Sequence, residues 1–158
     1  MDQQRQLREL EVMLFSTSSK GLCERESVGH LHTLVELYRL AALLYLNRAA
    51  LKYSGHELKH RRLVEEALLL LGDLQVHQAS WPLFIIACEA QTDAQRKEVL
   101  RLFPETAPRL YVKSSIDGLR HMVQTCWNQD DLHADRGLDY TTKLSAVISS
   151  SKFLPPFC

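Results

Sequence analysis

The sequence has no excess charge of either sign and no long hydrophobic run. Its 158 residues hold 19 Lys and Arg against 19 Asp and Glu, a formal net charge of zero. This charge balance gives no indication of the basic surface that direct nucleic-acid binding needs. It also gives no indication of electrostatic attraction to an anionic membrane. The richest apolar stretches, at 40–46 and 67–71, are far shorter than the roughly 20 residues of a bilayer-spanning helix. We therefore expect no direct nucleic-acid binding and no membrane partner.

Glycine, proline and cysteine are also scarce. Only 6 Gly and 5 Pro interrupt the chain, which favours a few long elements over many short ones. The 4 cysteines lie 65, 38 and 32 residues apart, without the C-x-x-C pair of a zinc or redox motif. We expect free thiols, mostly buried, in an intracellular protein of the nucleus or cytoplasm, since the polar N-terminus shows no signal peptide. The cysteines are Cys23, Cys88, Cys126 and Cys158.

Apolar residues recur with helical periodicity along most of the chain. The pattern predicts an all-α fold, a compact single domain over 1–158 with about six to seven helices. The segment 40–46 lacks polar residues, so we expect it to be buried on most sides. Polar residues at 16–21 and 128–137 predict a break and a linker. The expected helices are at about 3–15, 27–46, 58–76, 82–90, 93–102, 115–127 and 140–148. Ser54 and Gly55 are expected to break the chain between the second and the third, Leu58 is expected to face inward, and Ser115 is expected to cap the sixth.

The segment 83–90 (LFIIACEA) is apolar all round and is predicted to lie at the centre of the fold. It fits a buried strand as well as a helix. Helix is favoured because no other segment alternates well enough to pair with a strand, and because Pro82 suits a first helical turn. Thr92 and Gln95 have the spacing of a capping box, which predicts the start of the next helix.

Three segments in this order resemble a known family. They are YRLAALLYL at 38–46, LLLL at 68–71, and WPLFIIACEA at 81–90 followed by DAQR at 93–96, with Trp127 beyond them. The ordering is similar to the helical regulatory region of fungal zinc binuclear-cluster transcription factors. The resemblance covers roughly 30–130, and WPLFIIACEA is its most specific part. The six-cysteine DNA-binding module of such factors does not occur in this sequence.

The resemblance implies a regulatory domain that binds a protein partner or a small effector rather than DNA. The protein partner can be a second copy of the chain, which would give a homodimer. We expect no cofactor and no metal. A conformational equilibrium biased by the bound partner would carry the regulation. The candidate ligand-binding residues are Tyr45, Trp81, Glu89 and Trp127.

The alternative hypothesis is a small enzyme of fungal secondary metabolism, with His, Asp and Glu acid–base groups in an inter-helical pocket. His56 to His60 matches the H-E-x-x-H zinc motif, but a third ligand is not evident and a polar, exposed helix start is the favoured interpretation. Cys88 is expected to be buried and unreactive, because a nucleophilic role would need a neighbouring imidazole.

Overall fold

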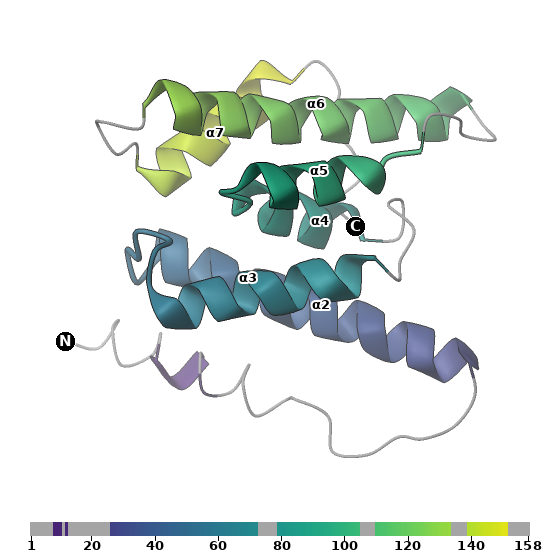
Figure 1. Ribbon diagram of the computed structural model, residues 1–158, viewed down its shortest axis with the longest axis horizontal. Helices are drawn as coiled ribbons and strands as arrows, with labels where there is room; N and C mark the ends of the chain where they lie inside the picture. Colours follow the sequence, from purple (N-terminus) through teal and green to yellow (C-terminus); the bar gives the residue numbers. More distant parts are fainter. Residues whose placement is uncertain are drawn as a thin grey trace. The chain divides into compact units, whose positions relative to one another are not determined.

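The computed structural model describes residues 8–10, 12, 26–72, 79–104, 110–133 and 139–151, and these ranges contain helices and no strand (Figure 1). The all-α prediction is confirmed. Of the expected helix at 3–15, only 8–10 and 12 lie within the described residues, and these are helical. The six helices with defined bounds are α2 Glu26–Ala49, α3 Leu58–Leu71, α4 Ser80–Cys88, α5 Asp93–Arg101, α6 Leu110–Leu132 and α7 Tyr140–Ser150.

The chain forms two compact units, Met1–Leu74 and Gln75–Cys158, hereafter unit 1 and unit 2. The expectation of a single domain over 1–158 stays a prediction. In unit 1, α2 packs against α3. Its interior is aliphatic, as the helical period of both segments predicts. The fully or nearly fully buried side chains are Leu37, Leu40, Ala41, Leu43, Leu44, Leu63, Val64, Ala67 and Leu71.

The break predicted at Ser54 and Gly55 is the turn between α2 and α3. Gly55 has a φ of 94°, a backbone region that glycine adopts without a steric penalty. The Glu57 carboxylate accepts hydrogen bonds from the backbone N–H of Ser54 at 2.9 Å and of Gly55 at 3.0 Å. These donors hold the Glu57 pKa at about 2, mainly through the Ser54 N–H. Leu58, expected to face inward, is 64% exposed because it is the first residue of α3.

In unit 2, α6 packs against both α4 and α7. Helix α4 confirms the helix interpretation of the central apolar segment, and every residue from Pro82 to Cys88 is buried. Pro82 lies in its first turn, where a missing N–H costs no intrahelical bond. Helix α5 begins with the predicted capping box: the Thr92 hydroxyl accepts from the Gln95 N–H, and the Gln95 side chain accepts from the Thr92 N–H.

Two boundaries of α6 differ from the sequence prediction. The helix begins at Leu110, five residues before the Ser115 that the pattern suggested as its cap, and it continues to Leu132. The first part of the segment predicted as a linker from Asn128 is therefore helical. Its acidic residues, Asp130 and Asp131, form ion pairs with Lys143 and Arg96, so they lie on a helix surface that contacts other elements. Among the described residues, none of the helices combines the length and the apolar character that crossing a membrane requires.

Candidate functional site

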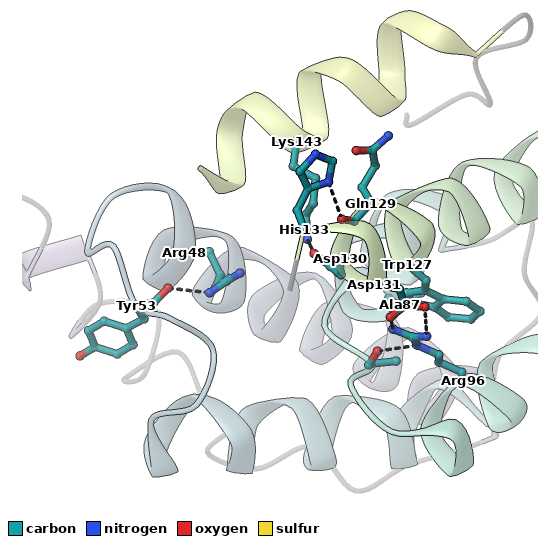
Figure 2. A network of polar contacts seen from close by, with 11 residues as sticks. Arg48, Tyr53, Ala87, Arg96, Trp127, Gln129, Asp130, Asp131, His133 and Lys143 are labelled. Atoms are coloured by element: carbon teal, nitrogen blue, oxygen red, sulfur yellow. Dashed lines mark hydrogen bonds and ion pairs between the residues drawn. The ribbon is translucent and has the colours of Figure 1, made fainter. Parts of the chain in front are cut away.

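The C-terminal end of α4 meets the C-terminal part of α6 through a buried indole (Figure 2). Trp127 Nε1 donates a hydrogen bond of 2.7 Å to the backbone oxygen of Ala87. Both residues are buried, so this bond satisfies a donor and an acceptor that water does not reach. The indole therefore fixes the position of α6 against the end of α4.

Arg96 of α5 covers the same indole from outside. Its guanidinium carbon lies 5.4 Å from the centre of the Trp127 ring, within cation–π range. Nη1 and Nη2 bind the two carboxylate oxygens of Asp131 at 2.8 and 2.9 Å, and Nε donates to the backbone oxygen of Ala90 at 3.3 Å. The hydrogen bonds between Arg96 and Asp131 raise the pKa of Arg96 and lower the pKa of Asp131. Arg96 thus connects α4, α5 and α6.

Next to these contacts lies a pair of buried thiols. Cys88, the last residue of α4, and Cys126 of α6 are both free, and their side chains are hydrogen-bonded to each other. Burial and this bond raise the Cys88 pKa well above its ordinary value. The Cys126 pKa is lowered, first by the bond from Cys88 and further by the positive charge of Lys143. Burial thus disfavours the Cys88 thiolate, whereas the surroundings of Cys126 favour its thiolate.

Lys143 of α7 brings a cation into the interior of unit 2. Its side chain is 3% exposed, and Nζ lies 2.7 Å from a carboxylate oxygen of Asp130, which is 40% exposed. Burial alone would lower the Lys143 pKa, but Cys126 and Asp130 outweigh it and raise the pKa above its ordinary value. The ammonium is consequently charged at neutral pH.

The four predicted ligand-binding residues fall into three places. Glu89, the buried C-cap of α4, follows Ala87 by two residues and so belongs to the same end of α4 as Trp127. Trp81 is half-buried near the opposite end, about 12 Å away along a helix that rises 1.5 Å per residue. Tyr45 belongs to unit 1. Within unit 2, Glu89 and not Trp81 thus belongs to the end of α4 that Trp127 contacts, and the binding role of all four residues stays a prediction.

The H-E-x-x-H segment does not form a helical pair of imidazoles. His56 is exposed and precedes α3, whereas His60 in the first turn of α3 is fully buried. The Nδ1 atom of His60 lies 3.4 Å from Nδ2 of Asn47, a buried residue of α2. The expectation of an exposed start is thus wrong for His60, which follows the core period of α3. Within the described ranges, no group of three or more His, Cys, Asp or Glu side chains is arranged to hold a metal ion.

One face of α2 is apolar but exposed, and we call it the α2 stripe. It consists of Leu31, Val35, Tyr38 and Tyr45, which are 60, 57, 37 and 41% exposed. Their spacings of four, three and seven residues place them on one side of a helix. Tyr45 is the member of the buried-looking segment 40–46 that reaches the surface. Large apolar side chains gathered on one exposed helix face are typical of an interaction surface.

Sequence reasoning missed Lys143 and Asp130 as neighbours of the thiols, and it missed the α2 stripe as a surface. No local pattern marks Lys143, because its partner lies 13 residues earlier on another helix. The stripe did leave a signal. Apolar residues of α2 occupy more of the helix circumference than one buried face requires, which indicates either burial on most sides or a second apolar face.

The described residues are all-helical, and comparison with known proteins identifies the family of the chain. Residues 2–146 match the fungal specific transcription factor domain. The chain belongs to this family, and a regulatory role related to transcription follows from that membership. The predicted resemblance is confirmed.

Among curated proteins, the chain is similar to transcription factor iacI of Pestalotiopsis fici, with 34% identity over 124 residues. The match covers 78% of this chain and 32% of that protein. The chain thus spans about a third of the length of the relative it matches. No solved structure matches the chain at a significant level.

Proposed function

We propose that this chain is the regulatory module of a transcription factor, and that it acts in the nucleus by binding a protein partner rather than DNA. Membership of the fungal specific transcription factor domain family supports the regulatory role. The formal net charge of zero supports a partner other than DNA. The observation that carries the proposal is the exposed α2 stripe.

The α2 stripe suits a partner that presents an apolar helix face. Leu31 and Val35 expose more than half of their side chains, and both would leave water when such a helix packs along α2. Tyr38 and Tyr45 add aromatic area with a polar tip, a combination that is enriched in protein interfaces. A second copy of the chain is one protein that carries this face, which would give the homodimer.

The test uses residues 1–158 fused to an unrelated DNA-binding domain that drives a reporter gene in a fungal host. We expect Val35→Glu to remove most of the effect of the fusion on reporter output, because a charge at the centre of the stripe opposes apolar packing. Leu69→Glu is the matched control: Leu69 of α3 is 80% exposed and lies outside the stripe. Equal loss of output in both variants, with both folded, would contradict the proposal.

Two measurements complete the test. Circular dichroism and thermal unfolding should be nearly unchanged in Val35→Glu, since an exposed substitution usually changes stability by no more than about 0.5 kcal/mol. Analytical ultracentrifugation of the wild type and of Val35→Glu then identifies the partner. A dimer that Val35→Glu dissociates assigns the stripe to a second copy, and a monomer in both cases assigns it to another protein.

Binding of a small effector is the second part of the expected regulation. Glu89 and Trp127, which share one end of α4, are the residues that support it. The enzymatic alternative stays a prediction, and nothing among the described residues favours it over the regulatory role.

A further inference from the structure

The thiol pair of unit 2 is used neither by the fold's polar contacts nor by the proposed partner surface. Cys88 and Cys126 lie 38 residues apart in the sequence, yet their side chains share a hydrogen bond. Both are almost completely buried, at 4 and 0% exposure. Two neighbouring thiols differ from a lone buried cysteine, because they can form a disulfide with each other.

The neighbouring bond keeps the two cysteines in register. Ala87 precedes Cys88 and Trp127 follows Cys126, and the 2.7 Å bond between Ala87 oxygen and Trp127 Nε1 joins them (Figure 2). Any slide of α4 along α6 would break this buried bond. The bond therefore holds together the parts of α4 and α6 that carry the two cysteines, and a disulfide would require their sulfur atoms to approach to about 2.05 Å.

The charged groups around the pair favour one reactive member. The Lys143 ammonium acts on Cys126 and is itself paired with Asp130, while Glu89 at the end of α4 acts on both sulfurs with the opposite sign. The positive charge of Lys143 favours the thiolate of Cys126. Thiolate is the form of cysteine that attacks oxidants.

We propose that Cys88 and Cys126 form an oxidation site, at which a hydroperoxide converts the two thiols into a disulfide between α4 and α6. This inference does not depend on the identity of the protein partner.

The reaction balances in two steps. The Cys126 thiolate attacks one oxygen of the hydroperoxide, the O–O bond breaks, and the leaving oxygen takes a proton to become water or an alcohol, which leaves a sulfenic acid on Cys126. The Cys88 sulfur then attacks the Cys126 sulfur, the S–O bond breaks, and the proton of Cys88 leaves with the hydroxide as water. The two thiols lose two electrons in total, and the hydroperoxide gains them.

The disulfide would join two helices that already pack, so it would stiffen unit 2 rather than rearrange it. Burial has two consequences for the site. A small hydroperoxide reaches the sulfurs when the α4–α6 contact opens locally, whereas a bulky thiol is excluded from the closed disulfide. Slow oxidation and slow reversal are both expected.

The main experiment uses the full chain with Cys23→Ser and Cys158→Ser, which leaves only the pair. Purified protein is treated with hydrogen peroxide, alkylated and mapped by peptide mass spectrometry. We expect a crosslinked peptide between Cys88 and Cys126, an intact mass lower by two hydrogen atoms, and a higher Tm that a reductant reverses. Recovery of both cysteines as alkylated thiols, or crosslinks only between separate molecules, would overturn the proposal. The same mapping on the wild-type chain keeps the test valid if the double variant does not fold.

Single variants test the order of the two steps. With Cys88→Ser, a sulfenic-acid probe should label Cys126 after peroxide treatment, because the resolving thiol is gone. With Cys126→Ser, Cys88 should remain largely unlabelled. Labelling that is equal in both variants would overturn the assignment of Cys126 as the attacking thiol.

Lys143→Met tests the role of the ammonium, and Lys113→Met, at an exposed lysine of α6, is the matched control. A change of one pKa unit in a thiol alters its thiolate fraction by about tenfold. We expect disulfide formation to be about tenfold slower in Lys143→Met and unchanged in Lys113→Met. An unchanged rate in Lys143→Met would overturn the part assigned to Lys143.

Discussion

Helix α2 of unit 1 exposes four large apolar side chains, whereas α4 of unit 2 buries seven consecutive residues from Pro82 to Cys88. Both helices are strongly apolar in sequence. They differ in that α2 has one apolar face that is buried and another that is exposed, whereas α4 has no exposed side chain from Pro82 to Cys88. Apolar content alone therefore does not separate a core helix from an interaction helix. The faces that remain exposed after packing make the distinction.

The two units also bury polar groups differently. Unit 1 encloses Asn47 and His60, whose side chains approach each other at 3.4 Å, and also the cation of Arg39, which is paired with Glu36 on the same helix. Unit 2 encloses the charged Lys143 with a half-exposed carboxylate beside it. Burying a charge without a counterion costs far more free energy than burying an amide without a hydrogen-bond partner. Each unit should consequently be sensitive to loss of the carboxylate beside its buried cation, Glu36 in unit 1 and Asp130 in unit 2, and the two differ in that the Glu36 partner lies on the same helix and the Asp130 partner on another.

The largest effect should come from the core of α4. Phe84 is 1% exposed, so Phe84→Ala removes a buried ring and should lower the free energy of unfolding by about 3–5 kcal/mol. Leu31→Ala on the α2 stripe should change it by no more than about 0.5 kcal/mol. Urea unfolding of the full chain measures both. Similar losses in the two variants would break the contrast between α2 and α4.

An intermediate effect is expected at the ion pair of unit 2. Asp130→Asn leaves the Lys143 ammonium buried without its carboxylate and should cost about 1–3 kcal/mol. Lys143→Met should cost less, because Asp130 is 40% exposed and water can solvate it, while Met fills the vacated space. Thermal unfolding of the two variants side by side checks this order. A greater loss in Lys143→Met would show that the buried cation is not the vulnerable member.

The smallest effect should come from the turn of unit 1, and it should depend on pH. The Glu57 pKa falls from its ordinary 4.5 to about 2 in the folded protein, so its contribution is present above about pH 4.5 and is lost as pH falls toward 2. The Tm of the wild type should exceed that of Glu57→Gln by no more than about 2 °C at pH 6, because this carboxylate is solvent-screened. The difference should shrink steadily toward pH 2.

Ser54→Ala sharpens this last measurement. It removes the Ser54 hydroxyl, which donates to Glu57 at 3.1 Å, and it keeps the backbone N–H that contributes most to the Glu57 pKa. Its Tm difference from the wild type should show a weaker pH dependence than that of Glu57→Gln. A difference for Glu57→Gln that grows on acidification would mean that the carboxylate destabilises the turn.

Much of the fold could be predicted because the signals for it lie within short stretches of the sequence. The apolar run of α4, the capping box at Thr92 and the break at Gly55 each reveal themselves within a few residues. The burial of His60 was also readable, since it precedes Leu63 and Val64 by three and four residues on the core face of α3.

The rest depends on contacts between distant residues. The segment after Asn128 looks like a linker because it is acidic, but Arg96, 35 residues before Asp131, pairs with that acidic residue. Likewise, the contact between Cys88 and Cys126 exists only because α4 packs on α6. Helical periodicity says which face of each helix is buried, and it does not say which helix covers it.

The arrangement of α4 has a consequence for synthesis on the ribosome. Trp127, which closes over the end of α4, lies 40 residues after Ala87. At about 5–20 residues per second, translation delivers this cover roughly 2–8 s after the apolar helix itself. In the interval between the emergence of α4 from the ribosome and that of Trp127, the nascent chain presents its most apolar helix without the helix that later covers it, so chaperones should bind the chain more strongly before α6 emerges than after.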